Sequence, residues 1–321
     1  MKCKKILTAL LAAACTMSGC HGDLDIMQDN KLSASNMWID ESDAETATYG
    51  IYLYMRDALK SVHDIYLCWG EFRNGLWGAG TNKTLSGVDQ TQVRTSTMSS
   101  SNAYADWSVM YKTVNQANLI LKHVPEMGIS ESVRNFSLGN AYFSRAWCYF
   151  WIARIWGDAP LALTGYESTG GDLYLPRAPK AEIFARIESD LTEAERYVTD
   201  NSDKAVATPA AVQMLKADYA LWMYRVAGGG SSYLTMAEKA IEALNLSASR
   251  LESDYAQVFS SANKLNKEVI FAVHQANGEA VNGPGYYLGW NSNYVEAAYQ
   301  NNPVPITGGN QWWWYTATRR C

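Results

Sequence analysis

The chain has 321 residues, a formal net charge of −5 and a pI near 5.5. This acidic balance argues against nucleic acid as a partner, because binding to phosphates requires clustered Lys and Arg. The four histidines are scattered and no CxxC motif occurs, so the cysteines and histidines lack the spacing of a zinc site. We therefore expect no metal and no cofactor. The length is sufficient for one large or two modest domains.

Aromatic residues make up 12% of the chain, and most of them are its 12 Trp and 20 Tyr. These two side chains combine a flat apolar face with a polar handle. Such rings suit two roles, namely the packing of large helices and stacking against sugar rings. Composition alone does not separate the two roles.

The N-terminal segment resembles an export signal. Three lysines at positions 2–5 precede a short apolar run at 6–14, which is followed by Met17-Ser18-Gly19-Cys20. The apolar run is too short to span a bilayer, so we expect residues 1–19 to be a secretory signal peptide. A cysteine after Ser-Gly indicates lipidation of Cys20 by acyl chains such as palmitate. The alternative is an ordinary signal peptide with an incidental cysteine. The polar residues 20–33 are predicted to form a tether.

Apolar residues recur three and four positions apart through most of the remaining chain. This periodicity predicts helices over 36–60, 102–123, 131–156, 180–199, 209–227 and 233–245. Gly157 and Pro160 are expected to end the third helix, as a cap and as a breaker. Consecutive helices of similar length are typical of tetratricopeptide-like pairs, although the consensus repeat is not visible.

Other parts of the chain lack a helical period. Residues 64–100 are rich in Gly, Thr, Ser and Asn, and we expect a long irregular segment of the kind that often carries function. Loose alternation of apolar residues predicts a strand within 265–275. Cys68 and Cys148 are expected to be two buried thiols, with a disulfide between them as the alternative.

Residues 145–160 read RAWCYFWIARIWGDAP. This segment resembles the SusD/RagB family of outer-membrane nutrient-binding lipoproteins of Bacteroidetes, whose pattern ends in Tyr/Trp-Gly-Asp-x-Pro. Further motifs agree in order along roughly residues 20–275. They are Asp43-Ala44-Glu45 with Gly50-Ile51-Tyr52, Glu71-Phe72-Arg73, Asn115 and Asn118, Arg177 with Glu182-Ile183 and Asp190-Leu191, and Glu268-Val269-Ile270-Phe271. Read from the residues themselves, most of these positions are structural, and we expect Arg145 to pair with a nearby carboxylate.

The resemblance implies a mainly α fold of tetratricopeptide-like helix pairs with long, irregular, aromatic-rich loops. It divides the chain into a helical N-terminal region at 34–255 and a partial C-terminal region at 256–321. Family members extend well beyond the point that this chain reaches. We therefore expect a C-terminally truncated or interrupted gene product, with a short natural variant as the alternative.

The family resemblance also implies a shallow aromatic platform that binds glycan without cleaving it. The first candidates are Trp69, Asn74 and Trp77 in the irregular segment. For each Trp the alternative is packing beneath the loop. The second candidates are Tyr286, Tyr287 and Trp290 in a Gly-rich stretch. The run at 312–314 is expected to be a core strand rather than a further platform.

These expectations lead to one leading hypothesis for function. The protein would be a cell-surface lipoprotein of the outer membrane that captures oligosaccharide and delivers it to a SusC-type TonB-dependent transporter. The alternatives are a peptide-binding RagB-like lipoprotein and a helical scaffold lipoprotein without its own ligand. We do not expect an enzyme, because the sequence contains no GxSxG, HExxH, P-loop or GxGxxG motif and no recognisable pair of glycosidase carboxylates.

Overall fold

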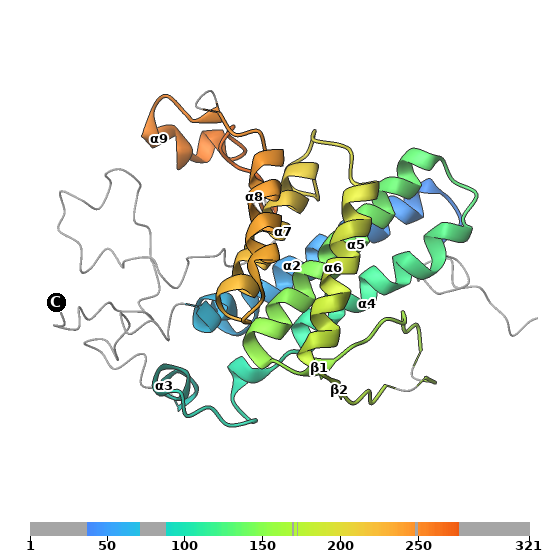
Figure 1. The fold of residues 1–321 in the computed structure, drawn as a ribbon. Helices are drawn as coiled ribbons and strands as arrows, with labels where there is room; N and C mark the ends of the chain where they lie inside the picture. Colours follow the sequence, from blue (N-terminus) through green and yellow to red (C-terminus); the bar gives the residue numbers. More distant parts are fainter. Residues whose placement is uncertain (1–36, 71–87, 169, 172, 248–249, 276–321) are drawn as a thin grey trace, which may run out of the picture. The chain divides into compact units, whose positions relative to one another are not determined.

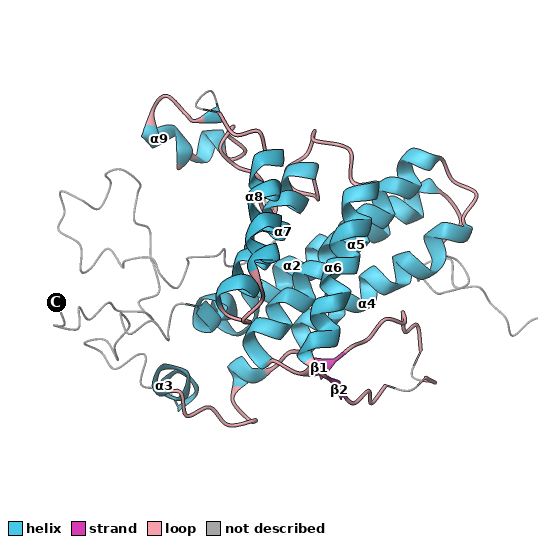
Figure 2. Ribbon diagram, viewed as in Figure 1, coloured by secondary structure: helices cyan, strands magenta, loops and turns pink. Residues whose placement is uncertain are grey.

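The computed structural model describes residues 37–70, 88–168, 170–171, 173–247 and 250–275 (Figure 1). The chain divides into two units, Met1–Ile39 and Asp40–Cys321, and the fold reported below is that of the second. Helices dominate its described residues, as the sequence predicts (Figure 2). None of these helices is both long enough and apolar enough to cross a bilayer.

Helices and 3-10 turns account for most of the elements in the described residues. The helices and 3-10 turns are α2 (Glu41–Gly70), α3 (Val88–Thr95), η2 (Ala103–Ala105), α4 (Ser108–His123), η3 (Val124–Glu126), α5 (Glu131–Trp156), α6 (Lys180–Tyr197), α7 (Pro209–Arg225), α8 (Ser231–Ala243), α9 (Tyr255–Val258) and η5 (Ser261–Asn263). Two short antiparallel strands, β1 (Ala159–Pro160) and β2 (Arg177–Ala178), pair Ala159 with Ala178 and Pro160 with Arg177. Figure 1 shows α4, α5 and α6 lying side by side.

Helix α5 is the centre of the packing. It contacts α2, α4 and α6, and α7 in turn packs against α6 and α8. Helix α5 carries small or apolar residues on most of its surface, which suits a helix with neighbours on several sides. Its Cys148 and the Cys68 of α2 are both buried and are not bonded to each other, which favours thiols over the disulfide.

Three predictions about the helices and the irregular segment were wrong. Helix α2 continues past residue 60 to Gly70, because Ile65 and Cys68 extend the buried stripe that includes Ala58. The segment 64–100 is therefore not irregular throughout, and it also contains α3. Helix α4 begins at Ser108 rather than 102, after η2.

No strand forms among the described residues of 265–275. The apolar alternation there has a different cause. The ring of Phe271 packs against Tyr52 and Phe143, with centroids 6.1 and 5.5 Å apart, and the amide of Ala272 donates to the carbonyl of Lys204 at 2.9 Å. The docked ring, this backbone bond and hydrogen bonds such as that from Lys204 Nζ to the carbonyl of Asn266 at 2.6 Å hold the segment without a strand ladder.

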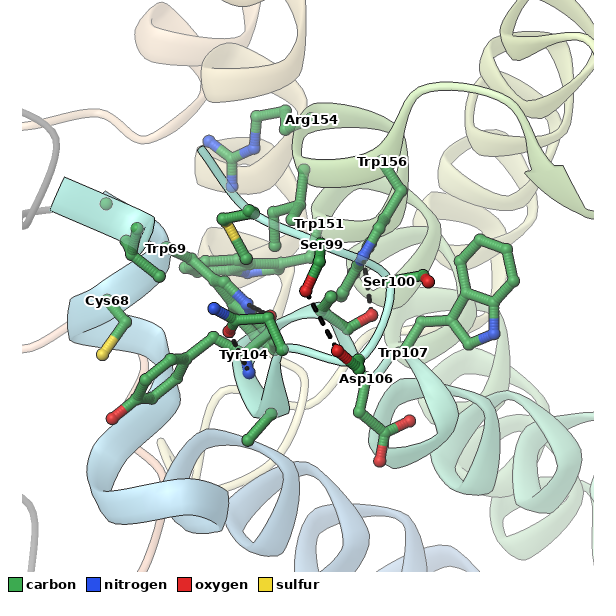
Figure 3. A pocket seen from close by; sticks show the side chains of 18 of the residues that line it. Cys68, Trp69, Ser99, Ser100, Tyr104, Asp106, Trp107, Trp151, Arg154 and Trp156 are labelled. Carbon is green, nitrogen blue, oxygen red and sulfur yellow. Dashed lines mark hydrogen bonds between the residues drawn. The ribbon is translucent and has the colours of Figure 1, made fainter. Parts of the chain in front are cut away.

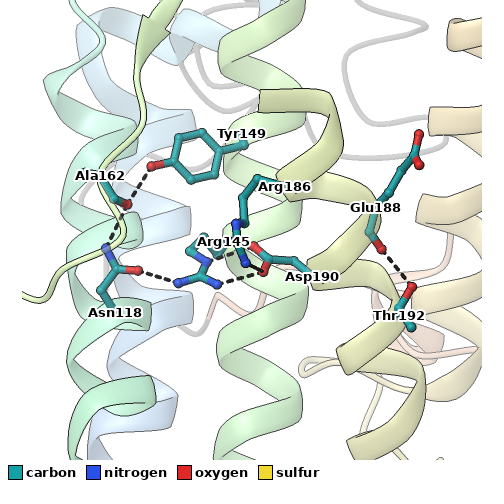
Figure 4. A network of polar contacts seen from close by, with 8 residues as sticks. All are labelled: Asn118, Arg145, Tyr149, Ala162, Arg186, Glu188, Asp190 and Thr192. Atoms are coloured by element: carbon teal, nitrogen blue, oxygen red, sulfur yellow. Dashed lines mark hydrogen bonds and ion pairs between the residues drawn. The ribbon is translucent and has the colours of Figure 1, made fainter. Parts of the chain in front are cut away.

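A buried polar network joins α4, α5 and α6 (Figure 4). Arg145 donates through Nε and Nη2 to the two carboxylate oxygens of Asp190, at 2.8 and 2.7 Å, and through Nη1 to Asn118 Oδ1 at 2.8 Å. The Arg145 side chain is 5% exposed and that of Asp190 is 0% exposed. This two-bond fork is the strong form of an arginine–carboxylate pair. It confirms the prediction that Arg145 pairs with a carboxylate.

The network also fastens the chain that follows β1. The amide of Asn118 donates to the carbonyls of Ala162 and Thr164, and the hydroxyl of Tyr149 donates to that of Ala162 at 2.7 Å. Gly165 lies so close to α4 that a Cβ there would stand 2.8 Å from the backbone nitrogen of Leu119. Residues 161–165 therefore lie directly on α4.

The Trp-Gly-Asp-x-Pro motif turns the chain from α5 towards α6. Gly157 ends α5 with a φ of 71°, a conformation that favours glycine. Asp158 then accepts the backbone N–H of Lys180 at 2.8 Å, at the first turn of α6. The carbonyl of Pro160 accepts the hydroxyl of Tyr111 at 2.6 Å. The motif thus fixes where α5 ends relative to α4 and α6.

Replacing Asp190 by Asn tests the importance of the buried pair. The buried Arg145 guanidinium would then face a neutral amide, and we expect the free energy of unfolding to fall by about 3–5 kcal/mol. Urea denaturation followed by circular dichroism measures this loss. Glu193→Gln is the matched control, because it removes a carboxylate of α6 that faces Arg196 at 3.5 Å on the surface. Its expected cost is below about 1 kcal/mol. An equal loss of unfolding free energy in the two variants would contradict the view that the buried Arg145–Asp190 pair is important for stability.

Candidate ligand-binding site

A cavity of about 1140 Å³ lies at the end of α5, between the last turn of α2, η2 and the start of α4 (Figure 3). Its aromatic lining residues are Trp69, Tyr104, Trp107, Trp151 and Trp156. Its charged lining residues are Asp106, Arg154, Arg177 and Asp218. The local fold explains this gathering, because α5 delivers two of the indoles from its final turns while α2 ends and α4 begins beside them.

The indoles are interlocked. The ring centroid of Trp69 lies 5.9 Å from that of Trp151 and 5.3 Å from that of Trp156, the latter in an edge-on arrangement. Trp107 approaches Trp156 edge-on at 6.1 Å. Edge-on and tilted contacts at such distances are favourable arrangements for aromatic pairs.

Two indole N–H groups are also fixed by the backbone of η2. Trp69 Nε1 donates to the carbonyl of Tyr104 at 2.9 Å, and Trp156 Nε1 donates to that of Ala105 at 3.1 Å. Each ring is thus held by both its neighbours and a hydrogen bond. The aromatic wall is therefore organised before any ligand arrives.

Two arginines border this wall. The guanidinium carbon of Arg154 lies 4.0 Å from the ring centroid of Phe150 and 5.0 Å from that of Trp151, and Nη1 approaches Asp218 Oδ2 at 3.4 Å. Burial lowers the pKa of Arg154, and the charge of Asp218 opposes that shift. The guanidinium of Arg177 lies over the ring of Trp107 at 4.5 Å. Both positions are typical of cation–π contacts.

Asp106 has a structural role. Its two carboxylate oxygens accept the backbone N–H and the hydroxyl of Ser108, at 2.8 and 2.9 Å. These bonds satisfy donors at the N-terminus of α4. Within the described residues, no group of three or more His, Cys, Asp or Glu side chains is arranged to hold a metal ion.

Of the residues predicted for the site, the structure places Trp69 in the cavity lining. It stands on the last turn of α2 rather than in an irregular segment, and it also packs against the hydrophobic core. The other predicted residues lie outside the described part of the chain. They are Asn74, Trp77, Tyr286, Tyr287 and Trp290 at the ligand site, and Cys20 at the lipidation site.

Sequence reasoning missed Trp107, Trp151 and Trp156. Their positions in or next to helices favoured a role in packing. Periodicity does not distinguish a ring that seals a core from one that lines a cavity at the end of the same helix. Here, contacts between chain segments that are far apart in the sequence determine which rings line the cavity.

Comparisons with known proteins agree with this architecture. Residues 79–222 match a SusD-like family model described as "Starch-binding associating with outer membrane". SusD-like protein P38 of Formosa agariphila is 26% identical over 190 residues, which are 59% of this chain and 36% of that protein. A SusD-like protein of Bacteroides ovatus is 26% identical over 174 residues, which are 52% of this chain and 32% of that protein.

Solved structures, SusD-like proteins among them, also share the fold of this chain. B. fragilis NanU superimposes with a TM-score of 0.65 at 28% identity, over 78% of this chain and 51% of NanU. A SusD superfamily protein from Bacteroides fragilis gives a TM-score of 0.69 at 25% identity, over 87% of this chain and 60% of its own. A laminarin-binding SusD-like protein shares the fold with a TM-score of 0.60 at 18% identity, over 73% of this chain and 51% of that protein.

The chain spans only 36% of the length of the Formosa relative and 51% of that of NanU. Within this span, the family model, the sequence relatives and the solved structures all point to one family. The helical fold agrees with the same assignment. Over this span the chain is similar in sequence and in fold to SusD-like proteins.

Proposed function

We propose that this protein binds an oligosaccharide in the indole-lined cavity and does not cleave it. The observation that carries the proposal is the cavity itself, in which four interlocked indoles stand beside an arginine–aspartate pair in a SusD-like fold. Two structures with this fold support the ligand class. One is described as laminarin-binding, and the other contains a xylogluco-oligosaccharide.

The physical chemistry of a sugar fits such a wall. The C–H faces of a pyranose ring are apolar and stack on indoles, whereas its rim of hydroxyls needs hydrogen-bond donors and acceptors. Here the indoles offer the apolar surface, and Arg154, Asp218 and the serines at 99–101 offer the polar partners. A rigid wall loses little conformational entropy when ligand binds, which favours affinity.

The carboxylates of the cavity suit binding rather than hydrolysis. Glycosidases need one carboxyl group as a general acid, typically held in an apolar environment, and a second one across the sugar. Both oxygens of Asp106 are engaged by Ser108, and Asp218 faces a guanidinium. Neither carboxylate stands alone against an apolar wall.

We extend the proposal to the place of action. The protein would be anchored through lipid on Cys20 to the outer membrane, on the cell surface, and would pass its glycan to a SusC-type TonB-dependent transporter. The N-terminal signal with its Ser-Gly-Cys ending supports the anchor. The family description, which names association with the outer membrane, supports the location.

Trp69→Ala tests the binding site. Removal of one indole from the wall is expected to weaken glycan binding about tenfold, or ~1.4 kcal/mol, because the sugar loses part of its stacking surface. Isothermal titration calorimetry of the full chain against laminari-, xylogluco- and manno-oligosaccharides measures the loss.

The chain offers a matched control in Trp147→Ala. Trp147 contacts the same partner ring, Trp151, with a centroid distance of 5.7 Å and an interplanar angle of 51°. The corresponding values for Trp69 and Trp151 are 5.9 Å and 48°. Trp147 does not line the cavity. This variant should lose stability and keep its affinity for glycan. If the wild-type chain binds none of the glycans, the proposal fails. Binding of peptides or capture of a barrel partner alone would then favour the peptide-binding or scaffold alternative.

Cys20→Ala tests the anchor. When the wild-type chain is expressed in a Gram-negative bacterium that is fed radiolabelled palmitate, it should carry label and sediment with the membranes. The variant should carry no label and leave the membrane fraction, because its thiol can no longer accept diacylglycerol. Persistent label in the variant would show that Cys20 is not the modified residue.

A further inference from the structure

The arginine–aspartate pair at the cavity connects two different helices. Arg154 comes from the last turns of α5, and Asp218 comes from the middle of α7. The Arg154 side chain is 26% exposed and that of Asp218 is 51% exposed, so both can be reached from the cavity that they line. Figure 3 shows Arg154 beside Trp151. Stacking on Trp151 and Phe150 holds the guanidinium in place.

The pair is only partly used. Within the described part of the chain, the one polar contact of either side chain is the 3.4 Å approach of Arg154 Nη1 to Asp218 Oδ2. Among the described residues, no other hydrogen bond engages Arg154 Nε, Arg154 Nη2 or Asp218 Oδ1. An arginine has five N–H donors, and a carboxylate has about four acceptor positions. Donors and acceptors therefore stand next to each other with capacity for a ligand.

A sugar hydroxyl is suited to this arrangement because it donates and accepts at once. It can accept from the guanidinium while donating to the carboxylate, and a neighbouring hydroxyl on the same ring can repeat the pattern. A ligand carboxylate would bind the guanidinium but would also face the like charge of Asp218.

The other charged residues that line the cavity do not add a site for a ligand carboxylate. Arg177 donates Nη1 to the carbonyl of Asp158 at 2.6 Å and lies over Trp107. The oxygens of Asp106 are engaged by Ser108. The lining thus holds two arginines and two aspartates, without an excess of positive charge.

We infer that Arg154 and Asp218 form the polar recognition element of the cavity, and that they select neutral sugars with adjacent hydroxyls over acidic sugars. This inference rests on the proposed function and deepens it by naming the ligand class. It assigns the two residues a role in specificity, distinct from the stacking surface of the indoles.

The test uses glycans that differ only at C6, where a hydroxymethyl group is replaced by a carboxylate. Gluco-, galacto- and manno-oligosaccharides are each paired with their uronic acid counterpart and titrated calorimetrically into the full chain. We expect the wild-type chain to bind at least one neutral member, and to bind its uronate at least about tenfold more weakly.

Asp218→Asn removes the acceptor charge and leaves the guanidinium. The affinity for the neutral member should fall about tenfold, and that for the uronate should rise, so that the preference narrows or reverses. The variant should fold normally, since an exposed ion pair contributes little to stability. Glu193→Gln is again the control, because it removes a carboxylate from a surface ion pair away from the cavity and should change neither affinity.

Two results would overturn the inference while leaving glycan binding intact. One is a wild-type preference for the uronates. The other is that Asp218→Asn keeps the wild-type preference for the neutral glycan over its uronate, although Trp69→Ala does weaken glycan binding. If the wild-type chain binds no member of any pair, the proposed function fails and this inference fails with it.

Discussion

The buried guanidinium of Arg145 is the constraint on which the rest of the structure depends. A charge in a dry interior is tolerated only when its donors are met, and here a carboxylate of α6 and an amide of α4 meet it. One side chain of α5 therefore fixes the relative positions of three helices. Through Asn118 the same network reaches the carbonyl of Ala162 and holds the following chain against α4.

The cavity follows from this fixed geometry. Because α5 is fixed at Arg145 and packs against α2, α4 and α6, its last turns bring Trp151, Arg154 and Trp156 to a defined place beside the end of α2. Gly157 then ends the helix and lets the chain turn away. The carbonyls of Tyr104 and Ala105 in η2 orient two of the indoles. The packing of the bundle and the preorganisation of the site thus have the same origin.

Much of the fold could be predicted from the sequence, because helices carry local signals. The apolar period of α5, the glycine at its end and the need of Arg145 for a carboxylate are all visible within one segment. The extension of α2 to Gly70 was missed because a segment rich in Gly, Ser and Asn follows it. The predicted strand around Phe271 was wrong because its alternation reflects docking of one ring against Tyr52 and Phe143.

The site was less predictable, for a physical reason. Trp69, Trp107, Trp151 and Trp156 come from three helical segments, and nothing in any single segment indicates that their rings meet. The pairing of Arg154 with Asp218 likewise spans 64 positions of the chain. Such groups become a site only when long-range packing brings them together.

The central claim is that these indoles are the surface that contacts glycan. The most direct measurement is fluorine NMR of the full chain labelled with 5-fluorotryptophan, with resonances assigned by single Trp→Phe variants and recorded during titration with a bound oligosaccharide. We expect saturable shifts for the wall indoles, above all for Trp69, Trp107 and Trp151. Trp222, which packs between Phe150 and Phe184 and does not line the cavity, should stay unchanged. Shifts confined to tryptophans outside the cavity, with these three unmoved, would contradict the claim.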